Sequence, residues 1–410
     1  MNLKVHKYPL LCRFIASSTR TPLKQLSIAI NTALNALRHY LDAFWAQAFK
    51  DFDAPQWVTQ TRCRILNNSS ELAQLTELHN QHTRHSPNIQ ATTHDFSTLY
   101  TKLSLLDLNT RMRRLIKMLW GHIAHNTHTT ENQLLLFVDT IHNRTEWTTD
   151  DKKPLKTNQF LLTAKSLAGW ISVLTFNTCV SHNNSLYKQI IGLPMGTNAA
   201  VNLANFTLYS YEYDHLISCL LRADYTTLHA LHYQKRYLDD IITLNNSDFD
   251  SFKYDIYPED TLTLDLEQDS LPLHCLDFHF YYNKPRNRLS FSLHSKQNDP
   301  KFKSLPHTHY PHPDSFISPA ILYNTYTGEL HRHLRNNSSF HSFTHTVRAL
   351  TQQLLNKSYN YKRLKSKLNN FIRQNRPIYN QVRTPSNLTA LIFSTLTNTS
   401  SSGSINKLDK

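Results

Sequence analysis

Two adjacent aspartates interrupt an otherwise apolar segment near the middle of the chain. The segment 236–244 reads RYLDDIITL, so Asp239 and Asp240 stand between Tyr-Leu and Ile-Ile. Neighbouring carboxylates repel each other and resist burial unless a cation or hydrogen-bond donors compensate them. Sequences break such local rules mainly where function requires it. We therefore expect a strand, an acidic turn and a returning strand, with the turn as part of a functional site.

A hairpin tip can present carboxylates to a divalent cation, because the turn frees the side chains from the two-face alternation of a strand. Phosphoryl transfer by two Mg²⁺ ions about 4 Å apart requires a further carboxylate on a neighbouring strand. Asp95, in the β-branched and aromatic segment 88–103, is one candidate, and Asp139 in LLLFVDTIH is its competitor. In nucleotide polymerases, an aromatic residue five positions after this aspartate packs under the sugar and leaves no room for a 2′-hydroxyl, and Tyr100 stands there after Asp95. No aromatic residue stands at that spacing after Asp139, so we prefer Asp95.

Three segments in order, DFSTLYT, GLPMGTNAAVNLANFTLYSYE and RYLDDI, resemble motifs A, B and C of reverse transcriptases. The likeness is strongest to the enzymes of Penelope-like retroelements, which are also similar to telomerase reverse transcriptase. It extends upstream to CRFIASSTRTPLKQLS and downstream through LHCLDFHF, SLHSKQNDPKF, HYPHP and NKSYNYKRLKSKLNNF, and so covers most of residues 8–375. The three motifs together are far more specific than YxDD alone.

The resemblance implies a metal site. Asp95 and Asp239 would hold two Mg²⁺ ions, with Mn²⁺ as an alternative, and Asp240 would support them. The backbone carbonyl of Phe96 would also reach a metal.

The same resemblance implies a nucleotide and primer site. Tyr100 would select deoxynucleotides by leaving no room for a 2′-hydroxyl, and Tyr237 would pack near the primer terminus. A turn of small residues would lie against the templating base pair and the incoming nucleotide, and it consists of Gly192, Pro194, Met195 and Gly196. Many reverse transcriptases have Gln where this chain has Met195.

Basic residues are expected to bind phosphates, since phosphate charge calls for cationic side chains. Candidates for the triphosphate lie in the N-terminal segment: Arg13, Arg20 and Lys24. Lys296 is a candidate primer contact. A basic stretch would follow the template–primer backbone without reading its sequence, and it comprises Lys362, Arg363, Lys365 and Lys367.

Periodicity supports a mixed fold around the hairpin. Apolar residues at helical spacing predict one long helix over 21–52, a basic helix over 108–125, an apolar helix over 200–223 and helices over 343–374. Alternation predicts a strand in 88–103 and a second hairpin over 275–296, whereas 144–158 is expected to be a polar excursion. Helices around hairpin strands indicate an α+β assembly.

The resemblance implies a right-hand polymerase with an antiparallel palm sheet, helical fingers and a helical thumb. We assign 1–88 to an N-terminal fingers segment, 89–300 to the palm with a fingers insertion at about 105–175, and 301–380 to the thumb. The last segment, 381–410, is a polar tail whose end we expect to be disordered.

Composition agrees with a nucleic-acid partner. The 410 residues contain 44 Lys and Arg against 30 Asp and Glu, a net charge of +14 that suits a polyanion. No apolar run approaches the roughly 18 residues of a membrane helix, so no membrane partner is expected. Five scattered cysteines indicate a reducing compartment. We expect an intracellular protein, nuclear if it belongs to a cellular retroelement, that binds an RNA template, a DNA primer and deoxynucleotides; the sequence leaves its oligomeric state open.

Two other functions remain open. An RNA-dependent RNA polymerase would share the carboxylates, but Tyr100 argues against it because such enzymes usually need a smaller or polar residue there. A domesticated, non-catalytic nucleic-acid-binding protein is the second alternative, and the presence of all three carboxylates argues against it. Histidines crowd 122–128 and 307–312 without Cys or acidic ligands at zinc-site spacing, so we expect no zinc site there.

Overall fold

The computed structural model describes residues 2–4, 11–13, 18, 21–59, 64–83, 89–193, 195–294, 310–375, 389–390, 392–393 and 396. The chain divides into two compact units. The first comprises Met1–Asn67 and Gln90–Ser270, and the second comprises Asn68–Ile89 and Leu271–Lys410. This division follows contacts within the chain, and the functional boundaries expected from the sequence stay predictions.

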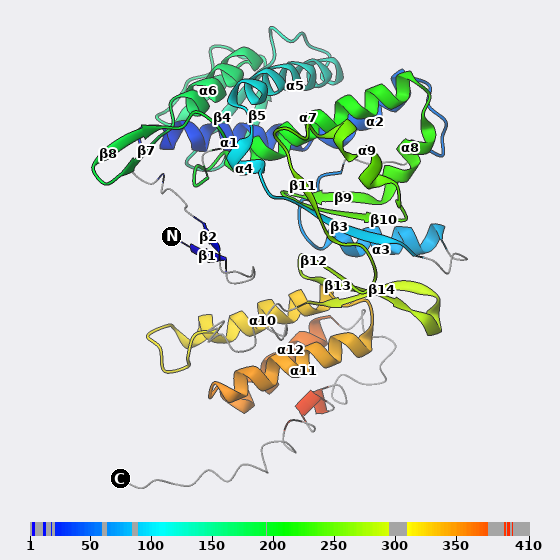
Figure 1. Ribbon diagram of the computed structural model, residues 1–410. Coiled ribbons are helices and arrows are strands. Elements are labelled where there is room, and N and C mark those ends of the chain that lie inside the picture. The colour runs from blue at the N-terminus through cyan, green and yellow to red at the C-terminus, as the bar shows by residue number, and fades with distance from the viewer. Residues whose placement is uncertain are drawn as a thin grey trace. The chain divides into compact units, whose positions relative to one another are not determined.

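The first unit contains a four-stranded antiparallel sheet, called the central sheet below (Figure 1). Its order is β11 (Leu264–Gln268), β3 (Ala91–Phe96), β10 (Asp240–Leu244) and β9 (Gln234–Tyr237). The strands β9 and β10 form the predicted hairpin, and the predicted strand of 88–103 is β3, followed by the short helix α4 (Leu99–Lys102). Two strands that are distant in sequence, β3 and β10, therefore become direct neighbours.

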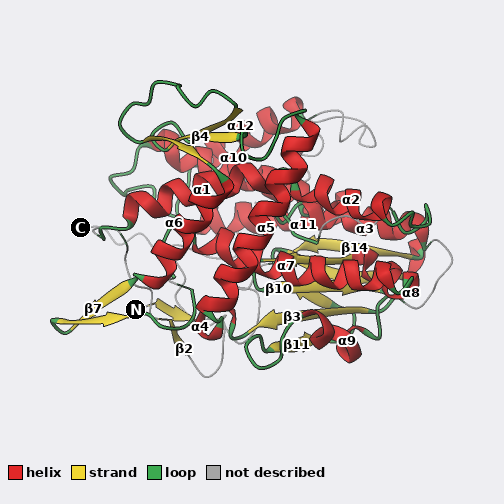
Figure 2. Ribbon diagram, turned by 90° about the horizontal axis from the view of Figure 1, so that it is seen from above, coloured by secondary structure: helices red, strands yellow, loops and turns green. Residues whose placement is uncertain are grey.

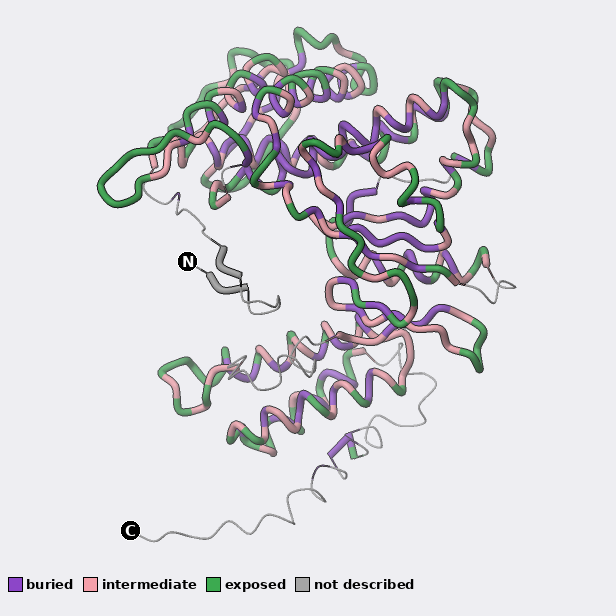
Figure 3. The backbone as a smooth tube through the Cα atoms, in the orientation of Figure 1, coloured by how far each residue is buried: buried purple, intermediate pink, exposed green. Residues whose placement is uncertain are grey.

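Helices cover one face of this sheet. The face carrying His94 and Phe96 is buried against α9 (Phe249–Ile256) and the residue after it, because His94 packs on Phe249 and Phe96 packs on Tyr257. The helix α7 (Ala200–Leu221) is buried along most of its length, as the purple tube in Figure 3 shows. Successive residues of a strand point to opposite faces, so Asp95 belongs to the other face of the sheet.

The prediction of one long helix over 21–52 is wrong, because the structure has two helices in this segment. The helix α1 (Lys24–Arg38) ends before Tyr40, whose N–H donates to Leu37 O at 3.0 Å, and α2 (Leu41–Asp51) begins directly afterwards. The turn redirects the second apolar stripe, so that Trp45 packs on Tyr209 and Tyr213 of α7. Uniform helical periodicity in the sequence hides such a change of axis.

Further helices and strands complete the first unit. The predicted basic helix is α5 (Leu105–Asn126), which lies beside α6 (Ala164–Phe176) and α7 (Figure 2). A second sheet has the order β5 (Arg144–Thr148), β4 (Leu135–Asp139) and β6 (Gln159–Leu162). The short elements are β1 (Asn2–Lys4), β2 (Leu11–Arg13), β7 (Cys179–His182), β8 (Ser185–Lys188), α8 (Tyr225–Ala230) and η1 (Leu231–Tyr233).

The strand β5 corrects the expectation of a polar excursion over 144–158. Its Trp147 packs edge-on against Trp120 at 4.8 Å between ring centroids and against Tyr40 at 6.0 Å. One large aromatic side chain therefore anchors a strand whose other residues are polar, and the polar majority concealed the strand.

The second unit combines a small sheet with helices. The second predicted hairpin is β13 (Phe278–Asn283) and β14 (Arg288–Leu293), joined through η2 (Lys284–Arg286) and extended by β12 (Leu273–Cys275). The helix α3 (Glu71–His82) attaches to it, because the Asn80 side chain exchanges two 2.9 Å hydrogen bonds with the backbone of Leu289. The helices expected over 343–374 are α11 (Phe340–Asn356) and α12 (Tyr361–Gln374), and α10 (Pro319–Arg335) precedes them within the segment assigned to the helical thumb. Among the residues described, no helix is both long and apolar enough to cross a membrane.

Candidate active site

Three aspartates stand at one level across three neighbouring strands of the central sheet. Asp95 on β3 is paired with Asp240 on β10 and with Asp265 on β11. Directly opposed residues in antiparallel strands share a face, so the three carboxylates lie on the same face. Tyr237 on β9, which is opposite Asp240, extends this row. The structure therefore brings Asp95 and Asp240 together, and it adds Asp265, which the sequence did not single out.

Asp239 occupies the turn between β9 and β10. The register pairs Tyr237 with Asp240, which leaves Leu238 and Asp239 as a two-residue turn. The carbonyl oxygen of Asp239 accepts a hydrogen bond from the N–H of Phe96 at 3.0 Å. This bond places the turn beside the end of β3, next to Asp95. The side chain of Phe96 is buried on the helix-covered face.

The competitor Asp139 lies in the other sheet, at the end of β4, and its carboxylate is fully occupied. One oxygen accepts the N–H groups of Ile141 and His142, both at 3.0 Å. The other accepts from the His142 ring at 3.0 Å and from Gln159 at 2.7 Å. These bonds hold the pKa of Asp139 well below its usual range, and the bond from the His142 side chain has the largest effect. Asp139 therefore caps a turn.

The predicted motif B turn is fastened to the backbone that follows Asp95. The N–H of Gly192 donates to Leu103 O at 2.8 Å, and that of Leu193 donates to Tyr100 O at 3.0 Å. Gly192 has a φ of +80°, and a Cβ there would stand 2.5 Å from Tyr100 O. Only glycine fits such an approach. The close approach seen at Gly192 is to the backbone of Tyr100, and a close approach of this turn to bases stays a prediction.

The remaining turn residues lie in different environments. Gly196 is exposed with a φ of +104°, and Met195 is half-buried. Pro194 lies outside the described residues. Tyr100 is half-buried against the core of the first unit, which agrees both with a core aromatic and with a residue at the edge of a site.

The start of α1 reaches the same turn. Lys24 Nζ donates to Asn198 Oδ1 at 2.7 Å, and Ser18 Oγ donates to Gly196 O at 2.5 Å. Lys24, one of the predicted triphosphate ligands, is thus brought to the predicted nucleotide turn. Arg20 and the side chain of Arg13 lie outside the described residues.

In the second unit, α12 carries its basic residues on the side away from its core. Leu364, Leu368, Phe371 and Ile372 are buried, whereas Lys362, Arg363 and Lys365 are exposed. Lys367 is half-buried and donates to Asn324 Oδ1 at 3.0 Å. The expected basic helix face is therefore present. Lys296 lies outside the described residues.

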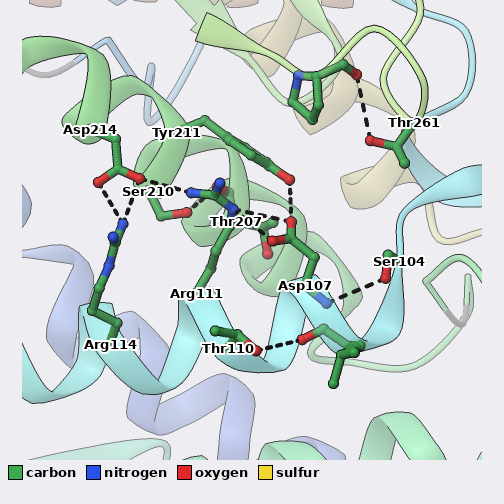
Figure 4. A network of polar contacts seen from close by, with 12 residues as sticks. Ser104, Asp107, Thr110, Arg111, Arg114, Thr207, Ser210, Tyr211, Asp214 and Thr261 are labelled. Atoms are coloured by element: carbon green, nitrogen blue, oxygen red, sulfur yellow. Dashed lines mark hydrogen bonds and ion pairs between the residues drawn. The ribbon is translucent and has the colours of Figure 1, made fainter. Parts of the chain in front are cut away.

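Two arginine–carboxylate networks on α7 were not anticipated from the sequence. In the first, shown in Figure 4, Arg111 and Arg114 of α5 bind Asp214, at 2.9 Å and 2.5 Å. Arg111 also binds Asp107 at 3.1 Å and stacks 3.5 Å from the Tyr211 ring. Burial, followed by the hydrogen bond to Asp107, raises the pKa of the Tyr211 hydroxyl. This network fastens α5, the predicted fingers insertion, to α7.

The second network is buried beneath the Leu238–Asp239 turn. Arg236 of β9 forms an ion pair with Glu212 of α7, and the distance from Nε to Oε1 is 2.7 Å. Tyr257 also donates to Glu212 Oε1, at 2.8 Å. The available sequence signals were a glutamate in a largely buried helix and an arginine three residues before Asp239.

Within the described ranges, no three His, Cys, Asp or Glu side chains are grouped so that they could hold a metal ion. Asp95 and Asp239 are brought near each other by the backbone hydrogen bond from Phe96 N–H to Asp239 O.

Comparisons with known proteins were made for the sequence and for the structure. No family model matches the sequence, and no curated protein matches it. The structure is similar to that of telomerase from Candida albicans, solved with a TWJ fragment of telomeric RNA, with 11% identity and a TM-score of 0.52 over 91% of this chain and 57% of that chain. Telomerase from Candida tropicalis, in complex with the same kind of RNA fragment, has 13% sequence identity and a TM-score of 0.42, over 91% of this chain and 56% of that chain. This chain thus spans little more than half the length of either, and its fold is similar to that of the Candida albicans telomerase.

Proposed function

We propose that this protein is an RNA-directed DNA polymerase, which extends a primer 3′-hydroxyl with deoxynucleotides by two-metal phosphoryl transfer. The observation that carries the proposal is the meeting of Asp95 with Asp239 and Asp240 at the end of the central sheet. The three sequence motifs supply the reason to interpret that meeting as a polymerase site. The similarity in fold to a telomerase agrees with it.

The donor set suits Mg²⁺. Like charges placed directly opposite each other in a sheet destabilise it, so the row Asp95, Asp240 and Asp265 calls for a cation. Mg²⁺ binds oxygen ligands and usually takes one or two carboxylates together with water and substrate phosphates. Asp95 and Asp239 would hold it here. When bound, Mg²⁺ supplies a lowered pKa for the attacking hydroxyl and positive charge for the leaving pyrophosphate.

The residues of the chain would position the reactants. Tyr237, on the same face and opposite Asp240, would pack against the primer terminus. The turn at Gly192, fixed to the backbone of Tyr100, would hold the incoming nucleotide and the templating base. Lys24, beside Asn198, would bind the triphosphate. Positioning of this kind accounts for much of the rate of phosphoryl transfer.

Template and primer would be bound mainly through their phosphates. The exposed Lys362, Arg363 and Lys365 of α12, together with the net charge of +14, support binding that does not depend on sequence. We propose RNA as the template from the motif resemblance, and the Candida albicans neighbour was itself solved with an RNA fragment. The same resemblance leads us to propose a mobile element as the origin.

Primer extension tests the proposal. The purified protein with Mg²⁺, poly(rA), oligo(dT) and dTTP is expected to extend the primer. Asp239→Asn removes a metal ligand and should lower the rate by about 10³-fold or more, with little change in template–primer affinity. Asp139→Asn is the matched control, because Asp139 only caps a turn, and its activity per folded molecule should be kept.

The outcomes separate the alternatives. Full activity of Asp239→Asn would contradict the site. Incorporation of UTP in preference to dTTP would favour an RNA polymerase. Tight binding of template–primer without extension by the wild type would favour a non-catalytic binding protein.

A further inference from the structure

A charged pair lies completely inside the first unit, directly beneath the turn that carries Asp239. Arg236 is 1% exposed and Glu212 is not exposed at all. Their two contacts measure 2.7 Å and 3.3 Å, so the guanidinium holds the carboxylate with two nitrogens. Burial of an ion pair is costly and is tolerated only when the geometry is good and every remaining polar atom has a partner.

The remaining donors of Arg236 are also used. Nη1 donates to Asn205 Oδ1 at 2.9 Å, and Nη2 donates to Asn205 O at 3.4 Å. Nη1 also donates to the carbonyl oxygen of Leu238 at 3.2 Å. Leu238 lies in the turn itself, so one arginine connects the turn to α7.

The backbone of Arg236 is held as firmly as its side chain. Its N–H donates to Arg64 O, and its carbonyl accepts from the N–H of Leu66, both at 2.8 Å. Ile65, between them, bridges to Arg236. The backbone position of Arg236 is therefore fixed, and the hydrogen bond from its side chain to Leu238 fixes the turn relative to it.

The turn needs such support. Leu238 has a φ of +56°. Two-residue hairpins require a positive φ at the first turn position, which is usually occupied by glycine, and other residues there cost about 1–3 kcal/mol. Among the bonds that hold this conformation, Arg236 donates to the carbonyl of Leu238, and Phe96 N–H donates to the carbonyl of Asp239.

We propose that the Arg236–Glu212 ion pair is a positioning unit for Asp239: it holds the strained turn so that the aspartate stays beside Asp95. The proposal rests on the proposed function for its kinetic consequence. A purely structural pair would be replaceable by neutral residues without loss of activity, since such replacements are often neutral for stability. A positioning unit is not replaceable in that way.

The test uses the full chain with Arg236→Met and Glu212→Gln combined. Both charges of the pair are removed together, and the glutamine can still accept from Tyr257. The folded double variant is expected to bind template–primer within about twofold of the wild type, while kcat falls by about 100-fold, the scale expected for a misplacement of about 1 Å. A wild-type kcat in this variant would overturn the proposal.

Tyr257→Phe is the matched control. It removes a bond to Glu212 within the same network but does not touch the turn. Its kcat should stay near that of the wild type. A fall as large as that of the double variant would mean that general loosening of the core, rather than contact with the turn, controls the rate, and would overturn the proposal.

Amide hydrogen exchange supplies a readout that does not depend on activity. In the double variant, exchange in the peptide 234–244 and at Phe96 should be about tenfold faster. This is the change expected when the stabilisation by one hydrogen bond is lost. If the wild type extends no primer, the proposed function fails, and unchanged exchange in the double variant would separately refute the positioning role.

A second substitution covers a folding defect. If the double variant does not fold, Arg236→Lys takes its place. Lysine retains the charge opposite Glu212, but a single ammonium cannot reproduce the fork that reaches Glu212, Asn205 and Leu238 together. The same faster exchange and lower kcat are expected, and wild-type values for both would overturn the proposal.

Discussion

The two arginine–carboxylate networks of α7 have the same chemistry but differ in their access to water. Glu212 and Arg236 are buried, with side-chain exposures of 0% and 1%. Asp214, two residues further on, is 40% exposed and its partner Arg114 is 51% exposed. Residues two positions apart on a helix point to nearly opposite sides. Water can replace a lost partner at Asp214 but not at Glu212. Loss of the buried network should therefore destabilise the fold more than loss of the exposed one, although both consist of arginine–carboxylate bonds.

The largest expected effect tests the buried side of this comparison. Glu212→Ala leaves the guanidinium of Arg236 buried without its counter-ion, and we expect the free energy of unfolding to fall by about 3–5 kcal/mol. Urea denaturation, monitored by circular dichroism, measures this change in the free energy of unfolding. Asp214→Ala is the matched control. A loss of less than about 1 kcal/mol at Glu212 would remove the contrast between the two networks.

A second prediction concerns another buried group on α7. Burial first, and then the charges of Arg64 and Arg222, lower the pKa of His215 to about 4. The folded protein therefore binds fewer protons than the unfolded chain, whose histidine pKa is about 6.5. The contribution to stability is present above pH 6.5 and is lost as the pH falls toward 4, by about 3 kcal/mol.

The variant His215→Gln isolates this contribution, because other histidines titrate in both proteins. Its free energy of unfolding should fall less steeply than that of the wild type between pH 6.5 and pH 4. Parallel pH curves for the two proteins would show that His215 does not titrate as the structure indicates.

The smallest expected effect belongs to the exposed network. Asp214→Ala should lower the free energy of unfolding by about 1 kcal/mol or less, since exposed ion pairs gain little over solvation. The loss should shrink further in 1 M salt, which screens exposed charges. Thermal unfolding at low and high salt measures both. A loss that is large and independent of salt would place this network with the buried one.

The sequence predicts much of the fold because local patterns decide it. The β9–β10 hairpin and the helices α5, α7 and α12 follow from periodicity, and Asp95 and Asp239 could be named as partners from motif order. The pairing of Asp265 with Asp95 could not be predicted, because register between distant strands is not a local property.

Other features also depended on distant partners. The strand β5 depends on Trp147 meeting Trp120, and the division of the first long helix depends on where Trp45 can pack. The Arg236–Glu212 pair requires that a strand and a helix come together. In each case the side chain was visible in the sequence, but its neighbour was not.

The contact at Gly192 has a mechanical consequence. Two backbone hydrogen bonds join the segments around Tyr100 and Leu193, and there is no room for a Cβ at Gly192, so the two segments behave as one rigid unit. Any motion that admits or releases a small molecule beside Asp95 must then bend the chain outside this unit, and labels placed on Tyr100 and Leu193 should keep a constant separation with and without added nucleotide.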